Sequence, residues 1–492
     1  MRLHTLAELA ARVGAALPPE ADPDLTIGPD VVIDSRRAGH GSLFVALPGE
    51  HVDGHDYTGA AAERGAAAVL ASRSTPAEVP HLLVDDPIAG LSSLARAVVD
   101  EARTAGLVTL AVTGSSGKTS TKDLLAQLLE AAGPTVAPVG SFNNEIGVPL
   151  TATRVDRHTR YLVSEMGARG VGHIRWLCSM TPPQISMVLN VGTAHLGEFG
   201  SVDGIARAKG EIVEALPADG WAVLNADDAR VAAMVSRTAA RVAWFSIAPE
   251  GPPGEGPPVE GPPGEGPLVW AEAIELDDLQ RPRFTLVFSE SGDVSRAERL
   301  PVSLPLMGRH MAANAVAAAA AAWRAGLEPA TIAARLSSVE HRSAWRMELG
   351  HTANGAAVIN DAYNANPDSM AAALRTLEPI GRSRRASHPG ARVYAVLGDM
   401  LELGGEAVER HREVGRLAAQ AGVDEVLAIG EHAETVVAAA REAGGHGRVV
   451  SVDEAGSLDL GPHDVVLVKA SRGLALERVA AAVLAHVAEE KS

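Results

Sequence analysis

The stretch VTLAVTGSSGKTSTKDLLAQLLEAAG, residues 108–133, decides the fold of the chain. It opens with a short apolar run typical of a buried strand, turns through GSSGKT at 114–119, and continues into a segment whose leucines recur at helical spacing. A strand, a glycine-rich turn and a helix in this order place backbone N–H groups around phosphate oxygens at the positive end of the helix. The stretch therefore predicts a site for ATP or another nucleoside triphosphate; the alternative is a glycine-rich turn without a ligand.

Two side chains of this loop have chemistry suited to a nucleotide. Lys118 offers a positive charge to the phosphates, and Thr119 offers a hydroxyl ligand to Mg²⁺. The loop is one residue shorter than the pattern GxxxxGK followed by Ser or Thr, unless Thr113 or Ala111 is counted in it. The predicted ATP-binding residues of the loop are Gly114, Ser115, Ser116, Gly117, Lys118, Thr119 and Ser120.

Outward from this stretch, short apolar runs alternate with helical segments along the whole chain. VVIDS, SLFVAL, AAVLAS and HLLVDD precede it, YLVSEMG, ISMVLNVG and WAVLNAD follow it, and AAVIND, VYAVLGD, EVLAIG, RVVSV and DVVLVKA form a third series. Buried runs this short, separated by helices, indicate mainly parallel sheets. We predict an α/β fold of three domains: a small N-terminal α/β domain over 1–105, a central P-loop ATPase domain over 106–338 with a mainly parallel sheet, and a C-terminal Rossmann-like domain over 339–492. The length of 492 residues agrees, at roughly 100–200 residues per domain.

The composition argues against nucleic-acid binding. With 43 basic against 61 acidic residues the chain has a formal net charge of −18, which opposes the phosphate neutralisation that nucleic-acid binding needs. Aromatic residues make up 3% of the chain, so stacking platforms for bases are scarce. We therefore expect small-molecule substrates and no nucleic acid.

The chain also carries signals of its compartment. Cys178 is its one cysteine, which excludes an intramolecular disulfide and a cysteine-based zinc site and fits a reducing cytosol. The N-terminal segment lacks the basic start and apolar run of a signal peptide. No stretch approaches the ~20 apolar residues of a membrane span. We expect a cytoplasmic monomer with no membrane span.

A proline and glycine tract, PEGPPGEGPPVEGPPGEGP, occupies residues 249–267. Its glycines keep no three-residue period, which excludes collagen and favours a solvated polyproline-like segment. The tract is either a linker between domains or an insertion within one. Strand-like runs stand on both sides of it, RVAWFSI before and LVWAEAIEL after, and these favour an insertion in the central domain.

Polar residues follow the apolar runs of the central domain. Glu165 ends YLVSE, His195 follows ISMVLNVGTA, and Lys209 lies in the helical stretch VDGIARAKGEIVEAL. Singly, these residues read as a solvated carboxylate, a structural histidine and a surface lysine paired with Glu211. Because ligands of open α/β sheets gather at the carboxyl ends of strands, their placement after the phosphate loop favours a Mg²⁺ site instead. Thr119, Glu165, His195 and Lys209 are the predicted metal ligands.

Several motifs, taken together, resemble the Mur ligase family. They cover all three predicted domains and occur in the family's order. The motifs are TGSSGKTS, SFNNEIGVPLT (141–151), SEMGA (164–168), NVGTAHLGEFGS (190–201), AKGEI, DAYNANPDSM (361–370), VLGDMLELG (396–404) and VLVKASRG (466–473).

The resemblance implies an ATP-dependent amide ligase of peptidoglycan synthesis. Its substrates would be ATP, UDP-N-acetylmuramoyl-tripeptide and D-alanyl-D-alanine, and its reaction would pass through an acyl phosphate. Sister ligases that add a single amino acid, and folylpolyglutamate synthases, are rival readings; NNEIGVPLT and DAYNANPDS argue against both. A nucleotide-dependent switch without ligase chemistry is a third alternative.

The resemblance also implies roles for residues around the nucleotide. Lys118 and Thr119 would hold the phosphates and Mg²⁺, Glu165 would share that first metal ion, and His195 would ligate a second. Lys209 matches a lysine that reacts with CO₂ to form a carbamate, an anionic oxygen ligand.

Residues further toward the C-terminus would contact the adenine base, the ribose and the γ-phosphate of ATP. Asn314 matches the asparagine that reads adenine, although Met311 stands where the family commonly has an amide. Arg346 in AWRMEL would reach the γ-phosphate, so that Lys118, Lys209, His195 and Arg346 form the catalytic set. Asp361 would bind the ribose, and the next residues, Tyr363 or Asn364, would lie near the nucleotide.

The remaining candidates concern the two other substrates. Asn143 and Asn144, successive amides beside the phosphate loop, are expected to contact substrate. For the sugar nucleotide the candidates in the first domain are Ser35, Arg36, Asp53 and His55, with a solvated basic pair at Arg36 and Arg37 as the alternative. For the dipeptide carboxylate the candidates are Lys469, Ser471 and Arg472, with a plain charge cluster at a strand end as the alternative.

Overall fold

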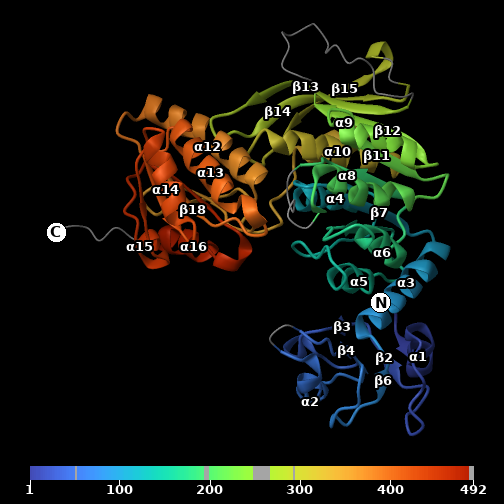
Figure 1. The fold of residues 1–492 in the computed structure, drawn as a ribbon. Helices are drawn as coiled ribbons and strands as arrows, with labels where there is room; N and C mark the ends of the chain where they lie inside the picture. The colour runs from blue at the N-terminus through green and yellow to red at the C-terminus, as the bar shows by residue number, and fades with distance from the viewer. Residues whose placement is uncertain (50–51, 193–198, 248–265, 292–293, 487–492) are drawn as a thin grey trace.

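The structure is a computed structural model that describes residues 1–49, 52–192, 199–247, 266–291 and 294–486. Three α/β domains follow one another along the chain, each built around its own sheet (Figure 1). Most neighbouring strands are parallel, so the predicted three-domain α/β fold is confirmed. The N-terminal domain lies below the central domain in this view, and the C-terminal domain lies beside the central one.

The N-terminal domain is a small parallel sheet in the order β3-β4-β5-β6, covered by helices. Its longest helix, α3, begins at Pro87, where the Asp86 side chain accepts a hydrogen bond from the Ile88 N–H. Leucines and valines of α3 pack on the sheet and on Leu162 of the central domain, so that α3 joins the two domains. The elements are β1 (His4–Thr5), α1 (Leu6–Val13), β2 (Thr26–Ile27), β3 (Val31–Val32), β4 (Leu43–Val45), α2 (Thr58–Glu63), β5 (Ala68–Ala71), β6 (His81–Leu83) and α3 (Pro87–Thr104).

The central domain is built on a sheet that, in the described part of the chain, has nine strands in the order β15-β14-β13-β12-β11-β10-β7-β9-β8. The strand that leads into the phosphate loop, β7, lies between β9 and β10, with all three parallel. Among the strands described here, only the pairs β13–β14 and β14–β15 are antiparallel in this sheet. Helices α4, α10 and α11 cover one face, and α6 and α8 cover the other. The carboxyl ends of β7, β9 and β10 therefore meet at one edge of the sheet.

The elements of the central domain are β7 (Val108–Thr113), α4 (Lys118–Glu130), β8 (Thr135–Val136), α5 (Gly147–Ala152), β9 (Tyr161–Glu165), α6 (His173–Met180), β10 (Ile185–Val188), α8 (Val202–Glu214), β11 (Trp221–Asn225), α9 (Ala229–Ala232), β12 (Arg241–Ile247), β13 (Leu268–Leu276), β14 (Pro282–Ser289), β15 (Glu298–Ser303), α10 (His310–Arg324) and α11 (Pro329–Leu336). The alanine-rich helix α10 is buried among the sheet, α4 and α11: the alanines from Ala317 to Ala322 are all 0% exposed. Such small side chains let a helix that is apolar all round pack closely against its neighbours.

Most of the proline and glycine tract, residues 249–265, lies outside the described residues. The strands before and after it, β12 and β13, are parallel neighbours in the central sheet, with Trp244 opposite Leu268. The tract therefore connects two strands of one sheet.

The C-terminal domain has a sheet in the order β16-β17-β21-β18-β19-β20, parallel except for β16. The register of β17 and β21 sets Asp361 directly opposite Lys469, at the carboxyl ends of both strands. The elements are β16 (Glu348–His351), β17 (Ala357–Asp361), α12 (Pro367–Ser387), β18 (Val393–Gly398), α13 (Ala407–Gln420), β19 (Glu425–Ile429), α14 (Ala433–Glu442), β20 (Gly447–Val449), α15 (Val452–Gly456), β21 (Val465–Lys469) and α16 (Glu477–Ala485).

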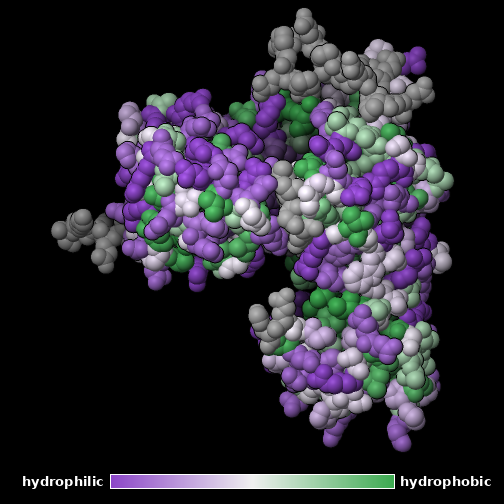
Figure 2. Space-filling model, viewed as in Figure 1, coloured by the Kyte–Doolittle hydropathy of each residue, from purple (hydrophilic) through white to green (hydrophobic). Residues whose placement is uncertain are grey.

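The outer surface is consistent with a chain that carries many charges. The face shown in Figure 2 is mostly hydrophilic, with hydrophobic residues gathered where the N-terminal and central domains meet. Among the helices that the structure describes, none is both long and apolar enough to span a membrane.

Candidate active site

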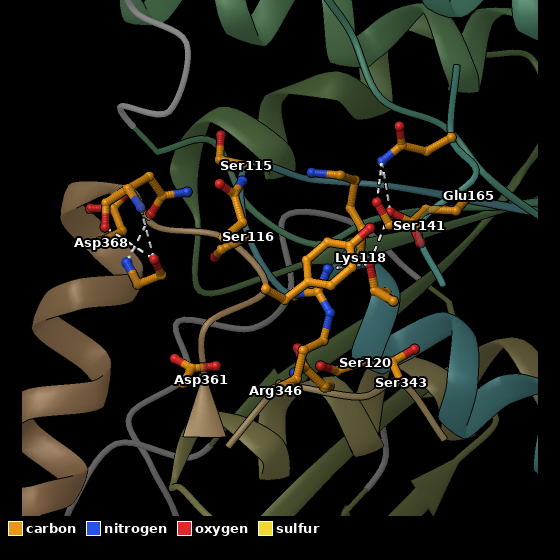
Figure 3. A pocket seen from close by; sticks show the side chains of 18 of the residues that line it. Ser115, Ser116, Lys118, Ser120, Ser141, Glu165, Ser343, Arg346, Asp361 and Asp368 are labelled. Carbon is orange, nitrogen blue, oxygen red and sulfur yellow. Dashed lines mark hydrogen bonds between the residues drawn. The ribbon is translucent and has the colours of Figure 1, made fainter. Parts of the chain in front are cut away.

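A cavity of about 640 Å³ lies between the central and C-terminal domains. This volume is in the range of small-molecule sites. Most of the residues predicted from the sequence line the cavity, and they come from both domains (Figure 3). The predicted residues in its wall are Ser115, Ser116, Gly117, Lys118, Thr119, Ser120, Asn143, Asn144, Glu165, Lys209, Asn314, Arg346, Asp361, Tyr363, Asn364, Lys469, Ser471 and Arg472.

The phosphate loop has a backbone that requires glycine at Gly117. Its φ is +79°, and a Cβ there would come within 2.5 Å of the Asn314 Oδ1. Gly117 immediately precedes α4, whose N-terminus faces the cavity. The loop thus has the geometry that brings a phosphate to the positive end of a helix.

Asn190, which the sequence analysis did not single out, holds this loop in place. Its Oδ1 accepts hydrogen bonds from the backbone N–H groups of Ser115 and Ser116, both at 3.0 Å. Two residues further on, the Gly192 N–H donates to the Ser115 Oγ at 2.9 Å. Asn190 opens the motif NVGTAHLGEFGS, and its place directly after the strand β10 was the available signal.

Lys118 lies in the loop with its ammonium turned back on the backbone. Its Nζ donates to the Gly114 carbonyl at 2.8 Å. Burial lowers the pKa of Lys118, and the nearby Arg346 guanidinium lowers it further, while Glu165 opposes both effects. Gly114, which does not line the cavity, thus takes part in the site through the carbonyl that accepts this bond from Lys118.

Thr119 and Glu165 form the centre of the predicted metal site. The Thr119 hydroxyl donates to the Glu165 Oε1 at 3.1 Å, and the Asn143 amide donates to the same oxygen at 2.9 Å. The other carboxylate oxygen, Oε2, is buried and has no hydrogen-bond partner among the described residues. A carboxylate oxygen left without a donor beside a hydroxyl suits a hard cation such as Mg²⁺. The residues therefore fit the metal ion that the resemblance implies.

The two other predicted metal ligands differ in what the structure describes. His195 lies outside the described residues, so its place is not part of this site geometry. Lys209, on α8, is 5% exposed and lines the cavity. Among the described residues of the chain, no three His, Cys, Asp or Glu side chains gather closely enough to hold a metal ion.

Lys209 is a buried lysine without an ion pair among the described residues. Burial lowers its pKa well below the usual value, and repulsion from Lys118 lowers it further. The surface pairing with Glu211 does not occur, since Glu211 is buried and accepts from the Gly172 and Arg175 N–H groups. The low pKa favours a neutral amine, which is the form of lysine that attacks electrophiles.

Asn314 is buried where α10 meets the phosphate loop. Its Oδ1 lies against Gly117, and its Nδ2 donates to the Met311 sulfur at 3.5 Å. Thioether sulfur is a weak acceptor, so Met311 competes weakly for this amide. The position of Asn314 beside the loop agrees with contact to a nucleotide.

Arg346 crosses from the C-terminal side of the cavity to the phosphate loop. Its guanidinium donates to the Thr119 Oγ1 at 2.9 Å and lies over the Tyr363 ring, 4.2 Å from the ring centroid. Figure 3 shows Arg346 below Lys118, next to Ser120. The predicted phosphate contact and the predicted metal ligand therefore meet across the domain boundary.

Lys469 forms a buried ion pair with Asp361 at the wall of the cavity. The side chain is 2% exposed, and its Nζ donates to the Asp361 Oδ2 at 2.6 Å and to the Asn364 carbonyl at 2.9 Å. The Met347 N–H donates to the other oxygen of Asp361. Lys469 thus fixes the predicted ribose ligand, and little of its ammonium is left to face a dipeptide carboxylate.

Replacing Lys469 by Met should destabilise the C-terminal domain. Removing one partner of a buried pair leaves the other charge uncompensated, at a typical cost of about 3–5 kcal/mol. Thermal or urea unfolding measures the change, and the double substitution Lys469→Met with Asp361→Asn should recover part of it. A Lys469→Met variant as stable as the parent protein would contradict the importance of this pair.

Ser471 and Arg472 differ in accessibility. Ser471 is 2% exposed, and its hydroxyl donates to the Ala365 carbonyl and accepts from the Leu401 N–H. The Arg472 side chain is half exposed, lies over the Trp345 ring at 4.5 Å and pairs with Glu477. Ser471 therefore joins two loops, whereas Arg472 offers a cation to the cavity.

The candidates of the N-terminal domain do not line the cavity. Ser35 is buried, and Arg36 is exposed and bonds Asp34 on its own turn, which lowers the pKa of Asp34 to about 2. The His55 ring is buried between the Asp53 carboxylate, at 2.6 Å, and Ser72. Hydrogen bonds from His55 hold the pKa of Asp53 well below its usual value. Asp34, Asp53 and His55 therefore form hydrogen bonds with residues of their own domain.

Asp368 was also not predicted, and it faces the phosphate loop from the C-terminal domain. It lies in the first turn of α12, which begins after the capping residue Asn366. A Cβ on Gly192 would come within 2.5 Å of the Asp368 Oδ2. In Figure 3 it lies near Ser115, and its motif, DAYNANPDSM, had already been noted.

The fold and the site define a P-loop nucleotide-dependent enzyme whose active site is shared between two α/β domains. Three family models match the chain: "Mur ligase family, catalytic domain" over residues 30–103, "Mur ligase middle domain" over 112–322 and "Mur ligase, glutamate ligase domain" over 345–472. The chain belongs to the Mur ligase family, and it is an ATP-using ligase.

Its relatives agree over nearly the whole length. The UDP-N-acetylmuramoyl-tripeptide–D-alanyl-D-alanine ligase of Mycobacterium tuberculosis is 41% identical, with 98% of each chain covered, and that of Escherichia coli is 36% identical over 92% of this chain and 93% of its own. Among solved structures, MurF from Acinetobacter baumannii matches with a TM-score of 0.81 at 29% identity, covering 98% of this chain and 99% of its own. MurF ligase from Thermotoga maritima, solved in complex with ADP, has a TM-score of 0.71 at 26% identity and covers 92% and 96%.

Proposed function

We propose that this chain joins D-alanyl-D-alanine to UDP-N-acetylmuramoyl-tripeptide with conversion of ATP to ADP and phosphate. The relatives that carry this activity in their names align over nearly the whole chain. The observation that carries the proposal is the meeting of Lys118 and Thr119 from one domain with Arg346 from the next in one cavity. A nucleotide switch needs no such shared site, whereas a ligase must bring two substrates to one phosphate.

The reaction begins with a carboxylate, which is a poor electrophile. The γ-phosphoryl group of ATP passes to the terminal carboxylate of the tripeptide and forms an acyl phosphate. The neutral amine of D-alanyl-D-alanine then attacks the carbonyl carbon, inorganic phosphate leaves, and the nitrogen loses a proton as the amide forms. Lys118 and Arg346 stabilise the charge of the transferring group at the end of α4.

The metal ion and the carbamate belong to this proposal. Thr119 and Glu165 would hold Mg²⁺ through the hydroxyl and the free Oε2, and His195 is proposed for a second ion. When bound, Mg²⁺ neutralises phosphate charge and supports transfer. Burial lowers the pKa of Lys209, and its neutral amine would add to CO₂ and release a proton, which turns a buried amine into an anionic oxygen ligand.

The other substrates are assigned by position. Asn143 lies beside Glu165 at the edge of the cavity, and Asn144 lines the same wall, where the tripeptide carboxylate must approach. Arg472 is the cation of the third domain most open to a dipeptide carboxylate. Ser35, Arg36, Asp53 and His55 remain proposed contacts of the sugar nucleotide. We also propose that the enzyme acts in the cytoplasm, as a monomer.

A rate assay with all three substrates tests the assignment. Phosphate release should require both UDP-N-acetylmuramoyl-tripeptide and D-alanyl-D-alanine, and a single amino acid should not replace the dipeptide. Phosphate release in the presence of ATP alone would favour a nucleotide switch. Release with a free amino acid would favour a sister ligase, and either result would overturn the proposal.

A further inference from the structure

One face of α4 is bonded to the segment 340–346 that leads into the C-terminal domain. Four residues of α4, spaced by one helical turn, each bond a residue of this segment. Three of the four pairs follow an antiparallel order, with three segment residues to each turn of the helix; the pair of Glu130 with Arg342 departs from it. The pairs are Gln127 with Glu340, Glu130 with Arg342, Asp123 with Ser343, and Thr119 with Arg346.

The pair at Gln127 differs from the other three because it involves only backbone groups of the segment. The Gln127 Nε2 donates to the Glu340 carbonyl at 3.0 Å, and its Oε1 accepts from the Glu340 N–H at 2.8 Å. Gln127 is 4% exposed, so both bonds are shielded from water. A reciprocal pair of this kind fixes the segment in one register along the helix.

The other three pairs between α4 and segment 340–346 hold the segment less firmly than the pair at Gln127, or depend on the register that it sets. The ion pair of Glu130 with Arg342 is about one-third exposed on both sides, and exposed pairs contribute little. Asp123, held by the buried Lys122 ammonium, accepts from the Ser343 hydroxyl. Arg346 then lies two turns of α4 away from Gln127, at the end that faces the phosphate loop.

We propose that Gln127 is a positioning residue: it sets the register of segment 340–346 on α4 and so places the Arg346 guanidinium at the phosphate end of that helix. The inference rests on the proposed role of Arg346 at the γ-phosphate. A misplacement of about 1 Å can cost on the order of 10²-fold in rate. Gln127 lines the cavity, but its side-chain amide is bonded to the backbone of Asp123 and Glu340, so that it acts through Arg346.

The first readout is nucleotide affinity, which needs no acceptor substrate. In the parent protein a non-hydrolysable ATP analogue should bind more tightly than ADP, because Arg346 reaches the γ-phosphate. Gln127→Met should reduce this preference to the level of Arg346→Ala while leaving ADP affinity within twofold. Gln420→Met, the same change at an exposed position of α13, is the matched control and should leave the preference unaltered.

The second readout is a double-mutant cycle on kcat. Gln127→Met should lower kcat by roughly 10-fold or more, and the double variant with Arg346→Ala should be no slower than Arg346→Ala alone. Ser343→Ala removes the hydrogen bond between the Ser343 hydroxyl and Asp123. It should also lower kcat without slowing Arg346→Ala further, and it replaces Gln127→Met in the test if that variant does not fold.

The outcomes separate this inference from the proposed function. An unchanged analogue preference, or losses that multiply in the double variant, would overturn the role of Gln127. If the parent enzyme makes no amide product while Gln127→Met still loses the analogue preference, the proposed function fails and the positioning role stands.

Discussion

Lys209→Ala should lower kcat by roughly 10²–10³-fold, and added formate or acetate should restore part of the lost rate. The substitution removes the proposed carbamate, an anionic oxygen ligand, and a short carboxylate can diffuse into the vacated space. Initial rates of ADP formation, measured with increasing carboxylate, check the prediction. Arg207→Ala is the matched control, since Arg207 is an exposed cation on the same helix.

The same residue predicts a dependence on pH and CO₂. Burial lowers the pKa of Lys209, so the amine is neutral at a lower pH than in an exposed lysine and can react with CO₂ there. Acid protonates the amine and reverses the carbamate, so activity on the acidic side should respond to added bicarbonate in the parent enzyme and not in Lys209→Ala. An Lys209→Ala variant that folds normally and recovers no rate at any carboxylate concentration would argue against the carbamate.

Thr119→Val should lower kcat by about 10²-fold or more. The hydroxyl bonds both Glu165 and Arg346, and the isosteric methyl group bonds neither. The effect should appear as a raised requirement for Mg²⁺ in the rate assay, because the proposed metal site loses one ligand. Binding of a Mg²⁺–nucleotide complex, followed by calorimetry, gives the same information without turnover.

Thr121→Val is the matched control for this substitution. Thr121 lies two residues further along α4, is fully buried, and its hydroxyl has no hydrogen-bond partner in the part of the chain that the structure describes. Replacing an unsatisfied buried hydroxyl by a methyl group removes a penalty of about 1–3 kcal/mol. Thr121→Val should therefore keep full activity and unfold at an equal or higher temperature. Equal losses in the two variants would mean that the hydroxyl of Thr119 has no special role.

The fold and the centre of the site could be predicted because local patterns determine them. The stretch around Lys118 carries strand, turn and helix within 26 residues, and the short apolar runs indicate α/β domains. Lys118, Thr119 and Glu165 follow strands that lie side by side in one sheet. For these residues the chain direction alone predicts the edge of the sheet at which they meet.

What could not be predicted depends on contacts between distant parts of the chain. The pairing of Lys469 with Asp361 follows from the register of β21 beside β17, which no local pattern encodes. The bonds of Gln127 to Glu340 span 213 positions. In the N-terminal domain, the hydrogen bond between Asp53 and His55, and that of His55 to Ser72, were likewise not predicted from the sequence.

The run of buried alanines in α10 has a consequence for how mutations in this protein would be interpreted. Asn314 stands on the same helix and meets Gly117 of the phosphate loop, so the position of α10 is also the position of a nucleotide contact. A bulkier residue between Ala317 and Ala322 cannot be accommodated without moving the helix. A genetic screen for loss of growth would therefore mark these alanines as functional, although none of them reaches a substrate.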